Sequence, residues 1–196
     1  DGLALDLDQG KLYWSERGTT PRILRANLDG TGTETVIDKV FGPFGLALDP
    51  AAGKLYWADW VAQKIQRANL DGSELEDLLS TVPARPRYLA LDSTADKMFW
   101  TGDRGASVWQ ATLDGGDNVA LVSGGFDGST GGIGLHKGNG QLFWTDAMSQ
   151  AVTKANMDGT GAEKIIFRRM EDPQGLALDE ARGKMYWADR EREQIL

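Results

Sequence analysis

The sequence contains no cysteine, so it offers no disulfide, no thiolate metal ligand and no cysteine nucleophile. It contains a single histidine, His136, which leaves a Ser-His-Asp set or a histidine-rich metal site almost without candidates. No apolar run approaches the ~18 residues that a membrane-spanning helix needs. These absences weigh against nucleophilic and metal-dependent catalysis, and we predict neither a cofactor nor a metal ion.

Positive charge is scarce as well. Lys and Arg together number 21 against 29 Asp and Glu, which gives a net charge of −8 and a pI near 4.7. No Lys/Arg-rich run supplies the basic footprint of a nucleic-acid-binding protein, and an acidic chain is repelled by an anionic membrane surface. A protein partner of basic or mixed charge fits this balance better than nucleic acid or membrane.

What the sequence does have is a repeat. A heptapeptide of the type Gly-Lys-Leu-Tyr-Trp-Ala-Asp recurs five times, at 10–16, 53–59, 96–102, 140–146 and 183–189. Its tryptophans are 43, 43, 44 and 43 residues apart, at Trp14, Trp57, Trp100, Trp144 and Trp187. A fixed period in this range indicates a repeat architecture.

Each repeat unit reads as four short strands. In the second unit, a Gly-Leu-Ala-Leu-Asp stretch at 45–49 leads through a turn at Gly53 into the Tyr-Trp strand. A third strand over 65–70 ends in Leu-Asp-Gly, a strong hairpin signal, and a fourth follows at 75–79. Four antiparallel strands in about 43 residues predict a blade of a β-propeller.

These units resemble the YWTD repeats of the low-density lipoprotein receptor family, which form six-bladed β-propellers. The resemblance covers essentially the whole chain, although tryptophan is the only motif residue present in all five units. It implies an all-β fold, with about four and a half blades of a six-bladed propeller present, because six units would need roughly 258 residues. A natural five-bladed ring is the alternative. We expect a single domain over 1–196 that is a fragment of a longer chain, with units at 1–43, 44–86, 87–130 and 131–173 and a partial unit at 174–196.

The Tyr-Trp pairs themselves are predicted to pack between neighbouring blades, where large aromatic side chains fill the space. The acid that follows the tryptophan suggests an additional stabilising interaction. Asp59 accompanies Arg67 on the next strand, and the third unit lacks both charges, with Gly102 and Gln110 at these places. We therefore expect an ion pair between these two positions, within or between blades.

Function is expected on one side of the predicted propeller. The turns between strands 1–2 and 3–4 are tight and nearly identical, whereas the 2–3 and 4–1 loops on the opposite side vary, and loops on a rigid scaffold commonly carry function. Trp60 is the only aromatic residue at its place in the repeat, so it is either an interface hot spot or a cover over its own blade. The candidate partner-binding residues are Arg17, Phe44, Asp59, Trp60, Arg85, Arg87, Tyr88, Arg104, Asp146 and Arg190.

An enzyme is the rival class, because propellers of the lactonase type carry out chemistry in their channel. Metal-dependent members need converging Glu, Asn and Asp where the inner strands open, and those strands here begin with Gly-Leu-Ala. The aspartates that end these strands lie beside tight turns, where capping is the expected role. His136 replaces one of them and is expected to be a turn residue.

The sequence therefore predicts a non-catalytic protein–protein interaction module that binds through the face bearing the 2–3 and 4–1 loops. The family resemblance implies an extracellular or cell-surface location. The expected partner is a protein or peptide ligand, or a neighbouring domain or subunit, with no nucleic acid and no membrane insertion. The alternatives are a structural propeller subunit of a larger assembly and, less favoured, a channel-site hydrolase.

Overall fold

The computed structural model describes residues 2–80, 85–103, 106–123, 130–167 and 170–196. It divides into two compact units, Asp1–Leu91 and Asp92–Leu196, with the boundary inside strand β9. Within these ranges, all regular structure is β-strand except one short 3-10 segment, η1 (Lys137–Asn139). No helix in the described ranges is long and apolar enough to cross a membrane.

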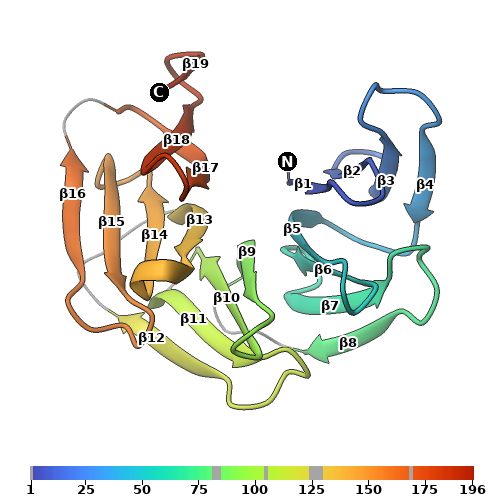
Figure 1. The fold of residues 1–196 in the computed structure, drawn as a ribbon, viewed down its shortest axis with the longest axis horizontal. Helices are drawn as coiled ribbons and strands as arrows, with labels where there is room; N and C mark the ends of the chain where they lie inside the picture. The colour runs from blue at the N-terminus through green and yellow to red at the C-terminus, as the bar shows by residue number, and fades with distance from the viewer. Residues whose placement is uncertain (1, 81–84, 104–105, 124–129, 168–169) are drawn as a thin grey trace. The chain divides into compact units, whose positions relative to one another are not determined.

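The first unit holds two four-stranded antiparallel sheets whose strands follow one another in chain order (Figure 1). The strands of the first sheet are β1 (Leu3–Asp6), β2 (Lys11–Glu16), β3 (Arg22–Asn27) and β4 (Glu34–Ile37). The strands of the second are β5 (Pro43–Asp49), β6 (Lys54–Asp59), β7 (Lys64–Asn69) and β8 (Glu76–Leu79).

The later sheets repeat this meander. The third sheet consists of β9 (Pro86–Asp92), β10 (Lys97–Gly102), β11 (Ala106–Thr112) and β12 (Val119–Ser123). The fourth consists of β13 (Thr130–His136), β14 (Gln141–Asp146), β15 (Ala151–Asn156) and β16 (Glu163–Phe167). The fifth consists of β17 (Pro173–Asp179), β18 (Lys184–Asp189) and β19 (Gln194–Ile195).

The strand count corrects the expectation of four and a half blades of a six-bladed propeller. The described part of the chain forms five sheets of four, four, four, four and three strands. The third strand of the fifth sheet, β19, pairs with β18 through Ala188↔Ile195 and Asp189↔Gln194. Two residues are enough to form this strand because the Trp187 and Leu196 backbones also exchange two hydrogen bonds of 3.0 Å.

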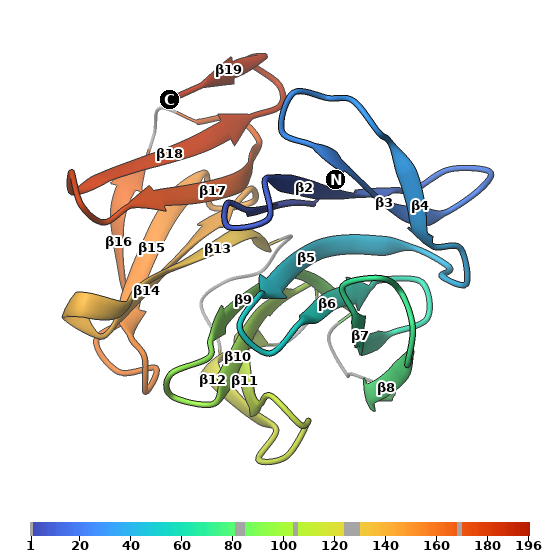
Figure 2. The same cartoon turned by 45° about the vertical axis from the view of Figure 1, so that its right-hand side comes forward.

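The predicted packing role of the Tyr-Trp strand is confirmed in the second, third and fourth sheets, whereas Tyr186 of the fifth sheet is 46% exposed. Tyr56 and Trp57 are 2% and 0% exposed. Strands β1 and β5 lie side by side (Figures 1 and 2), and Tyr13 of the first sheet shares one apolar cluster with Leu46 and Trp57 of the second. In the second unit β13 lies beside β17 in the same way (Figure 2). The repeat therefore buries apolar area on both faces of a sheet by stacking neighbours.

The residue after the tryptophan adds a polar link between neighbouring sheets. The Ser15 hydroxyl donates to the Phe44 carbonyl over 2.5 Å in the first unit. In the second unit, Thr101 donates to the Gly131 carbonyl over 2.8 Å, and Thr145 donates to the Gln174 carbonyl over 2.6 Å. Ala58 and Ala188 hold this place in the other two sheets and cannot donate.

The Asp-Gly turns after the third strands form as predicted. Asp29 accepts hydrogen bonds from the backbone and hydroxyl of Thr31 at 2.9 and 2.7 Å, while Gly30 adopts φ +84°. Asp71 and Ser73 repeat the arrangement around Gly72, which adopts φ +88°. Glycine is required at Gly72 for a second reason, because a Cβ there would lie 2.1 Å from the Val36 carbonyl oxygen of the neighbouring sheet.

The predicted ion pair between the acid after the tryptophan and the base on the next strand is wrong. The base is paired, but with a different acid. The register places Arg67 opposite Tyr56 and Glu76, and its guanidinium lies 2.6 Å from Glu76. Arg25 pairs with Glu34 and Lys154 with Glu163 in the same way. In the third sheet Gln110 lies opposite Val119, so both charges of the pair are replaced together.

Candidate interaction surface

Asp59 organises the loops on the side of the first unit where the 2–3 and 4–1 loops meet. Its carboxylate is fully buried and accepts backbone N–H groups from Phe41 at 2.8 Å, Gly42 at 3.0 Å and Ala62 at 2.8 Å. The Trp60 N–H donates to the Gly42 carbonyl over 2.9 Å, which ties the two loops together from the other direction. Asp59 thus positions the two loops around it. Because its side chain is buried, it presents no atom to a partner, and the expectation that Asp59 is exposed is corrected.

Asp189 makes the corresponding hydrogen bonds in the fifth sheet. It accepts backbone N–H groups from Glu171 at 2.9 Å and Asp172 at 3.1 Å, and its side chain is 1% exposed in relative terms. Burial raises the pKa of Asp189, but the backbone hydrogen bonds from Glu171, Asp172 and Arg192 outweigh this effect and leave the pKa below its ordinary value. In the second and fifth sheets, the last residue of the repeat motif is therefore a buried acid that holds a neighbouring loop.

Arginine side chains stack on aromatic rings beside the Asp59 clamp. The Arg17 guanidinium carbon lies 4.2 Å from the centroid of the Phe44 ring, and that of Arg87 lies 4.7 Å from the same centroid. Phe44 also meets Tyr88 edge-on, with ring centroids 5.0 Å apart and an interplanar angle of 74°. Both distances to Phe44 are within the range of a cation–π interaction.

Trp60 and Arg85 form a second pair of this kind. The Arg85 guanidinium carbon lies 4.7 Å from the centroid of a Trp60 ring. Arg85 adopts φ +36°, a backbone conformation that is uncommon for a residue with a side chain. Trp60 therefore does more than cover its own blade, because the guanidinium of Arg85, from the next 4–1 loop, stacks on its ring.

Two apolar side chains extend this area. Phe41 is 71% exposed and Val61 is 54% exposed, although both lie on loops that Asp59 and Gly42 hold fixed. Gly42 is needed here, because a Cβ would lie 2.5 Å from a methyl carbon of Val61. Neither residue is among the candidate partner-binding residues predicted from the sequence, since loops lack the periodicity that separates inward from outward positions. We call this area the arginine–aromatic surface; it consists of Arg17, Phe41, Phe44, Trp60, Val61, Arg85, Arg87 and Tyr88.

The remaining predicted site residues lie in the second unit or outside the described ranges. Asp146 is fully buried and accepts the Ser149 N–H at 3.0 Å, so it holds the loop that follows β14. The expectation that Asp146 is exposed is therefore corrected. Arg190 is exposed and pairs with Asp172 at 2.5 Å. Arg104 falls outside the described residues. The structure thus brings together six of the ten predicted residues on the arginine–aromatic surface.

The described residues offer no cluster of three or more His, Asp or Glu side chains that could hold a metal ion. The aspartates that end the inner strands cap turns as expected. Asp6 accepts the Gln9 N–H at 3.0 Å and Asp49 accepts the Ala52 N–H at 3.2 Å. His136 occupies the corresponding place in the fourth sheet, directly before η1, as a turn residue.

Comparisons with known proteins agree with this fold. The structure superimposes on a chain in a crystal structure of a nidogen/laminin complex with a TM-score of 0.89, over 99% of this chain and 73% of that one, at 24% sequence identity. A likeness at this identity establishes the fold alone. The fold is thus that of an all-β propeller built of four-stranded blades.

Sequence comparison supplies the family. The family profile described as low-density lipoprotein receptor repeat class B matches residues 53–92. A protein of Pyricularia oryzae named low-density lipoprotein receptor-related protein 1 is 32% identical, over 96% of this chain and 74% of its own length. The chain therefore belongs to the family of low-density lipoprotein receptor class B, or YWTD, repeat proteins.

Two animal relatives match over shorter stretches. Low-density lipoprotein receptor-related protein 5 of Mus musculus is 37% identical over 25% of this chain, which corresponds to 3% of the mouse protein. Nidogen of Drosophila melanogaster is 32% identical over 32% of this chain and 5% of its own length. The chain spans a small part of these two relatives.

Proposed function

We propose that this chain is a non-catalytic protein-interaction module that binds a protein or peptide through the arginine–aromatic surface. The observation that carries the proposal is the stacking of Arg17, Arg85 and Arg87 on aromatic rings, next to the exposed Phe41 and Val61. Receptor-related and nidogen relatives, and a structural neighbour that is a chain of a nidogen/laminin complex, support a role in protein binding.

The geometry favours a partner segment with carboxylates beside an apolar anchor. A guanidinium that stacks on a ring keeps its N–H donors in one plane, where they match the two oxygens of a carboxylate. Arg and aromatic side chains are also the residue types that dominate binding energy at interfaces. Phe41 and Val61 offer apolar area for the anchor. The rest of the surface of this acidic chain would repel such a partner, which localises binding to this area.

We further propose that residues 1–196 form a single domain. We also propose that the protein acts outside the cell or at its surface, as the names of its receptor and nidogen relatives suggest. A secretion assay on the natural full-length protein, with detection in the medium and on intact cells, tests this location. Recovery only from the cell interior would contradict it.

The binding proposal is tested with the immobilised chain and concentrated extracellular fluid, with bound proteins quantified by mass spectrometry. The test variant combines Trp60→Ala and Arg17→Ala; Arg17 is preferred to Arg87 because it is exposed, whereas Arg87 is 8% exposed and supports Phe44. The matched control combines Lys184→Ala and Tyr186→Ala, a cation and an aromatic residue on β18. Thermal unfolding confirms that both variants are folded.

We expect a defined set of proteins that binds the parent and the control and is lost at least tenfold from the test variant. Arg17→Lys alone should also weaken capture, because lysine offers neither the planar fork nor the stacking of arginine. A protein set retained equally by the parent and by the folded test variant would reject the arginine–aromatic surface.

A further inference from the structure

The turn between β13 and β14 in the fourth sheet lacks a hydrogen bond that the corresponding turns of the other four sheets share. In those sheets an aspartate at the end of the first strand caps the turn, because its carboxylate accepts the N–H of the residue three positions later. The pairs are Asp6 with Gln9 at 3.0 Å, Asp49 with Ala52 at 3.2 Å, Asp92 with Ala95 at 3.3 Å and Asp179 with Arg182 at 3.0 Å. A carboxylate therefore holds each of these four turns.

In the fourth sheet His136 takes the place of the aspartate. Its side chain makes no capping hydrogen bond to η1 within the described part of the chain. The residue three positions later is Asn139, which is exposed and ends η1. The Gly140 N–H donates to the Lys137 carbonyl over 3.2 Å, and none of the three residues of η1 is buried. A 3-10 turn of this length, without a cap or a buried side chain, opens at little cost in free energy.

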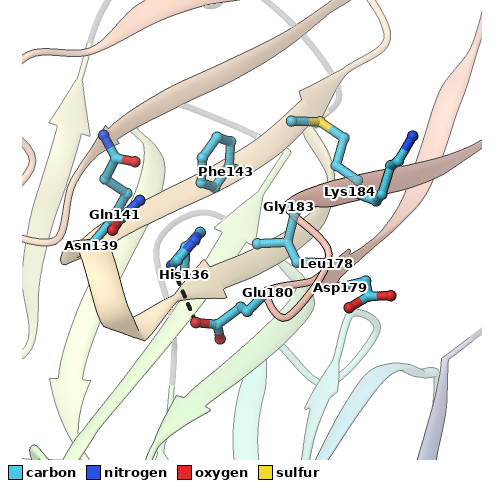
Figure 3. A pocket seen from close by; sticks show the side chains of 10 residues that line it. His136, Asn139, Gln141, Phe143, Leu178, Asp179, Glu180, Gly183 and Lys184 are labelled. Carbon is cyan, nitrogen blue, oxygen red and sulfur yellow. Dashed lines mark ion pairs between the residues drawn. The ribbon is translucent and has the colours of Figure 1, made fainter.

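The contacts between this turn and the fifth sheet do not involve Asn139. The Gly138 N–H donates to Glu180 Oε2 over 3.4 Å, and the same oxygen lies 3.1 Å from His136 Nδ1. Figure 3 shows the His136–Glu180 pair and places Asn139 outside it, at the rim of the groove between the two sheets. These contacts hold the beginning of the turn and leave its last residue exposed.

Asn139 is followed by Gly140, and the sequence contains no other Asn-Gly pair. In such a pair the glycine nitrogen can attack the side-chain amide carbon of the asparagine, because glycine has no Cβ to obstruct the approach. A bond forms between the Gly140 nitrogen, which loses its proton, and Asn139 Cγ. The bond from Cγ to the amide nitrogen breaks, and ammonia leaves. Water then opens the resulting succinimide at either carbonyl, which gives aspartate or isoaspartate without any enzyme or cofactor.

Three other asparagines are protected from this reaction by their hydrogen bonds. They end the third strands of their sheets and are Asn27, Asn69 and Asn156. Each donates its side-chain amide to a Thr or Ser hydroxyl at 2.8–2.9 Å. The nitrogen of the residue that follows each of them, which would have to attack, donates to a turn glycine carbonyl at 2.9–3.1 Å. Both reacting groups are therefore occupied in these three places.

We propose that Asn139 is a site of spontaneous deamidation in the folded protein. The missing carboxylate cap leaves the Asn139 backbone free to rotate once the 3.2 Å bond between Gly140 and Lys137 opens. Both products add a negative charge to a groove rim that already carries Glu180. The modified fraction increases with time after synthesis, so the site records the age of the molecule.

Isoaspartate has a second effect, because it adds one methylene to the backbone between residues 139 and 140. The Gly140 carbonyl accepts the Met157 N–H over 2.9 Å, and this bond ties the turn to the end of the third strand. A longer backbone displaces the acceptor. The isoaspartate form should therefore lose protection at Met157, while the matching bond from Leu28 to Gly10 in the first sheet, at 3.1 Å, stays intact.

The test incubates the whole chain and the peptide acetyl-Lys-Gly-Asn-Gly-Gln-Leu-amide in the same neutral buffer. Samples are digested at intervals, and mass spectrometry quantifies the deamidated fraction at each asparagine. We expect Asn139 to react within about tenfold of the rate in the free peptide, and at least about tenfold faster than Asn27, Asn69 and Asn156. A rate at Asn139 no higher than at these three internal controls would overturn the proposal.

Two variants test the role of the missing cap. His136→Asp restores the carboxylate found in the other four sheets and should slow the reaction at Asn139 about fivefold or more. Gln9→Asn places an Asn-Gly pair in the capped turn of the first sheet, and residue 9 should then react about fivefold more slowly than Asn139. Thermal unfolding confirms that both variants are folded. An unchanged rate at Asn139 in a folded His136→Asp chain would show that the cap does not control the reaction, and so would equal rates at residues 9 and 139.

The structural consequence is measured on the isoaspartate form, which chromatography separates from the parent. We expect amide hydrogen exchange at Met157 to be about tenfold faster or more, with exchange at Leu28 unchanged. Equal exchange at Met157 in the two forms would overturn the predicted loosening of the fourth sheet.

Discussion

The Phe41 main-chain N–H donates to Oδ2 of Asp59 over 2.8 Å, which joins an exposed aromatic side chain to a carboxylate with no exposure. The same carboxylate also holds Gly42 and Ala62. One buried acid thus fixes the backbone of the two loops that carry Phe41, Trp60 and Val61. Substitution of Asp59 should therefore affect stability and binding together.

We predict that Asp59→Asn lowers the free energy of unfolding by about 2 kcal/mol, because the amide provides one acceptor oxygen where the carboxylate provides two. Chemical denaturation with fluorescence of the tryptophans measures the loss. Glu76→Gln is the control, since its partly exposed pair with Arg67 should contribute less than about 1 kcal/mol. An Asp59→Asn chain as stable as the parent would show that the three N–H bonds do not hold the loops.

The turn glycines Gly30 and Gly72 provide a matched pair with φ of +84° and +88°. Alanine at Gly30 meets no atom within 4 Å, so it should cost only the conformational penalty of about 1–2 kcal/mol. Alanine at Gly72 adds a contact of 2.1 Å with the Val36 oxygen and should cost clearly more, on the order of 3 kcal/mol or above. Comparison of the two unfolding free energies isolates the close approach of the sheets, and equal costs would refute it.

Thr145 links the fourth and fifth sheets through its hydroxyl, which donates to the Gln174 carbonyl over 2.6 Å. Thr145→Ala and Thr145→Val should both destabilise the chain, by about 1–2 kcal/mol, because each leaves this carbonyl without its donor. Thr145→Ser keeps the hydroxyl and should cost less than either. If valine were tolerated as well as serine, the contribution of Thr145 would be its volume and not its hydrogen bond.

Acid should destabilise the fold. The side-chain hydrogen bond from Lys64 lowers the pKa of Asp77, and in Asp189 the backbone N–H bonds lower the pKa despite the opposing effect of burial. A carboxylate whose pKa is depressed by folding contributes stability that is present above its unfolded pKa near 3.9 and is lost as the pH falls through the folded value. We expect the unfolding free energy to hold between about pH 7 and 5 and to fall below about pH 4. Asp189→Asn should show a shallower fall, measured by denaturation at several pH values.

Much of the fold could be read from the sequence because the repeat signals are local. The Trp57 spacing, the Asp29-Gly30 type of turn and the short apolar strands each depend on a few neighbouring residues, and the structure contains them as predicted. The acid that pairs with Arg67 could not be read in this way. Glu76 reaches it through strand register across β7 and β8, which the charge pattern along the chain does not encode.

The site was harder to predict than the fold. The sequence predicts Arg17, Trp60 and Arg85 as loop residues, and the structure adds the stacking on aromatic rings that gives them a common role. The burial of Asp59 could not be predicted because an acid at the end of a strand is usually exposed, and here it accepts N–H groups 17 and 18 residues earlier in the chain. Exposure of loop side chains such as Phe41 has no sequence signal of its own.

The chain-order pairing of strands has a consequence for how the protein is made. Each four-stranded sheet is assembled from consecutive residues of one repeat of about 43, so most of its contacts close short loops. At a synthesis rate of about 5–20 residues per second, the residues of a new sheet emerge from the ribosome roughly every 2 to 9 seconds. This interval is far longer than the microseconds in which hairpins form. Each sheet can therefore pair its strands before the next one arrives, so the first sheet forms before the second one covers its Tyr13.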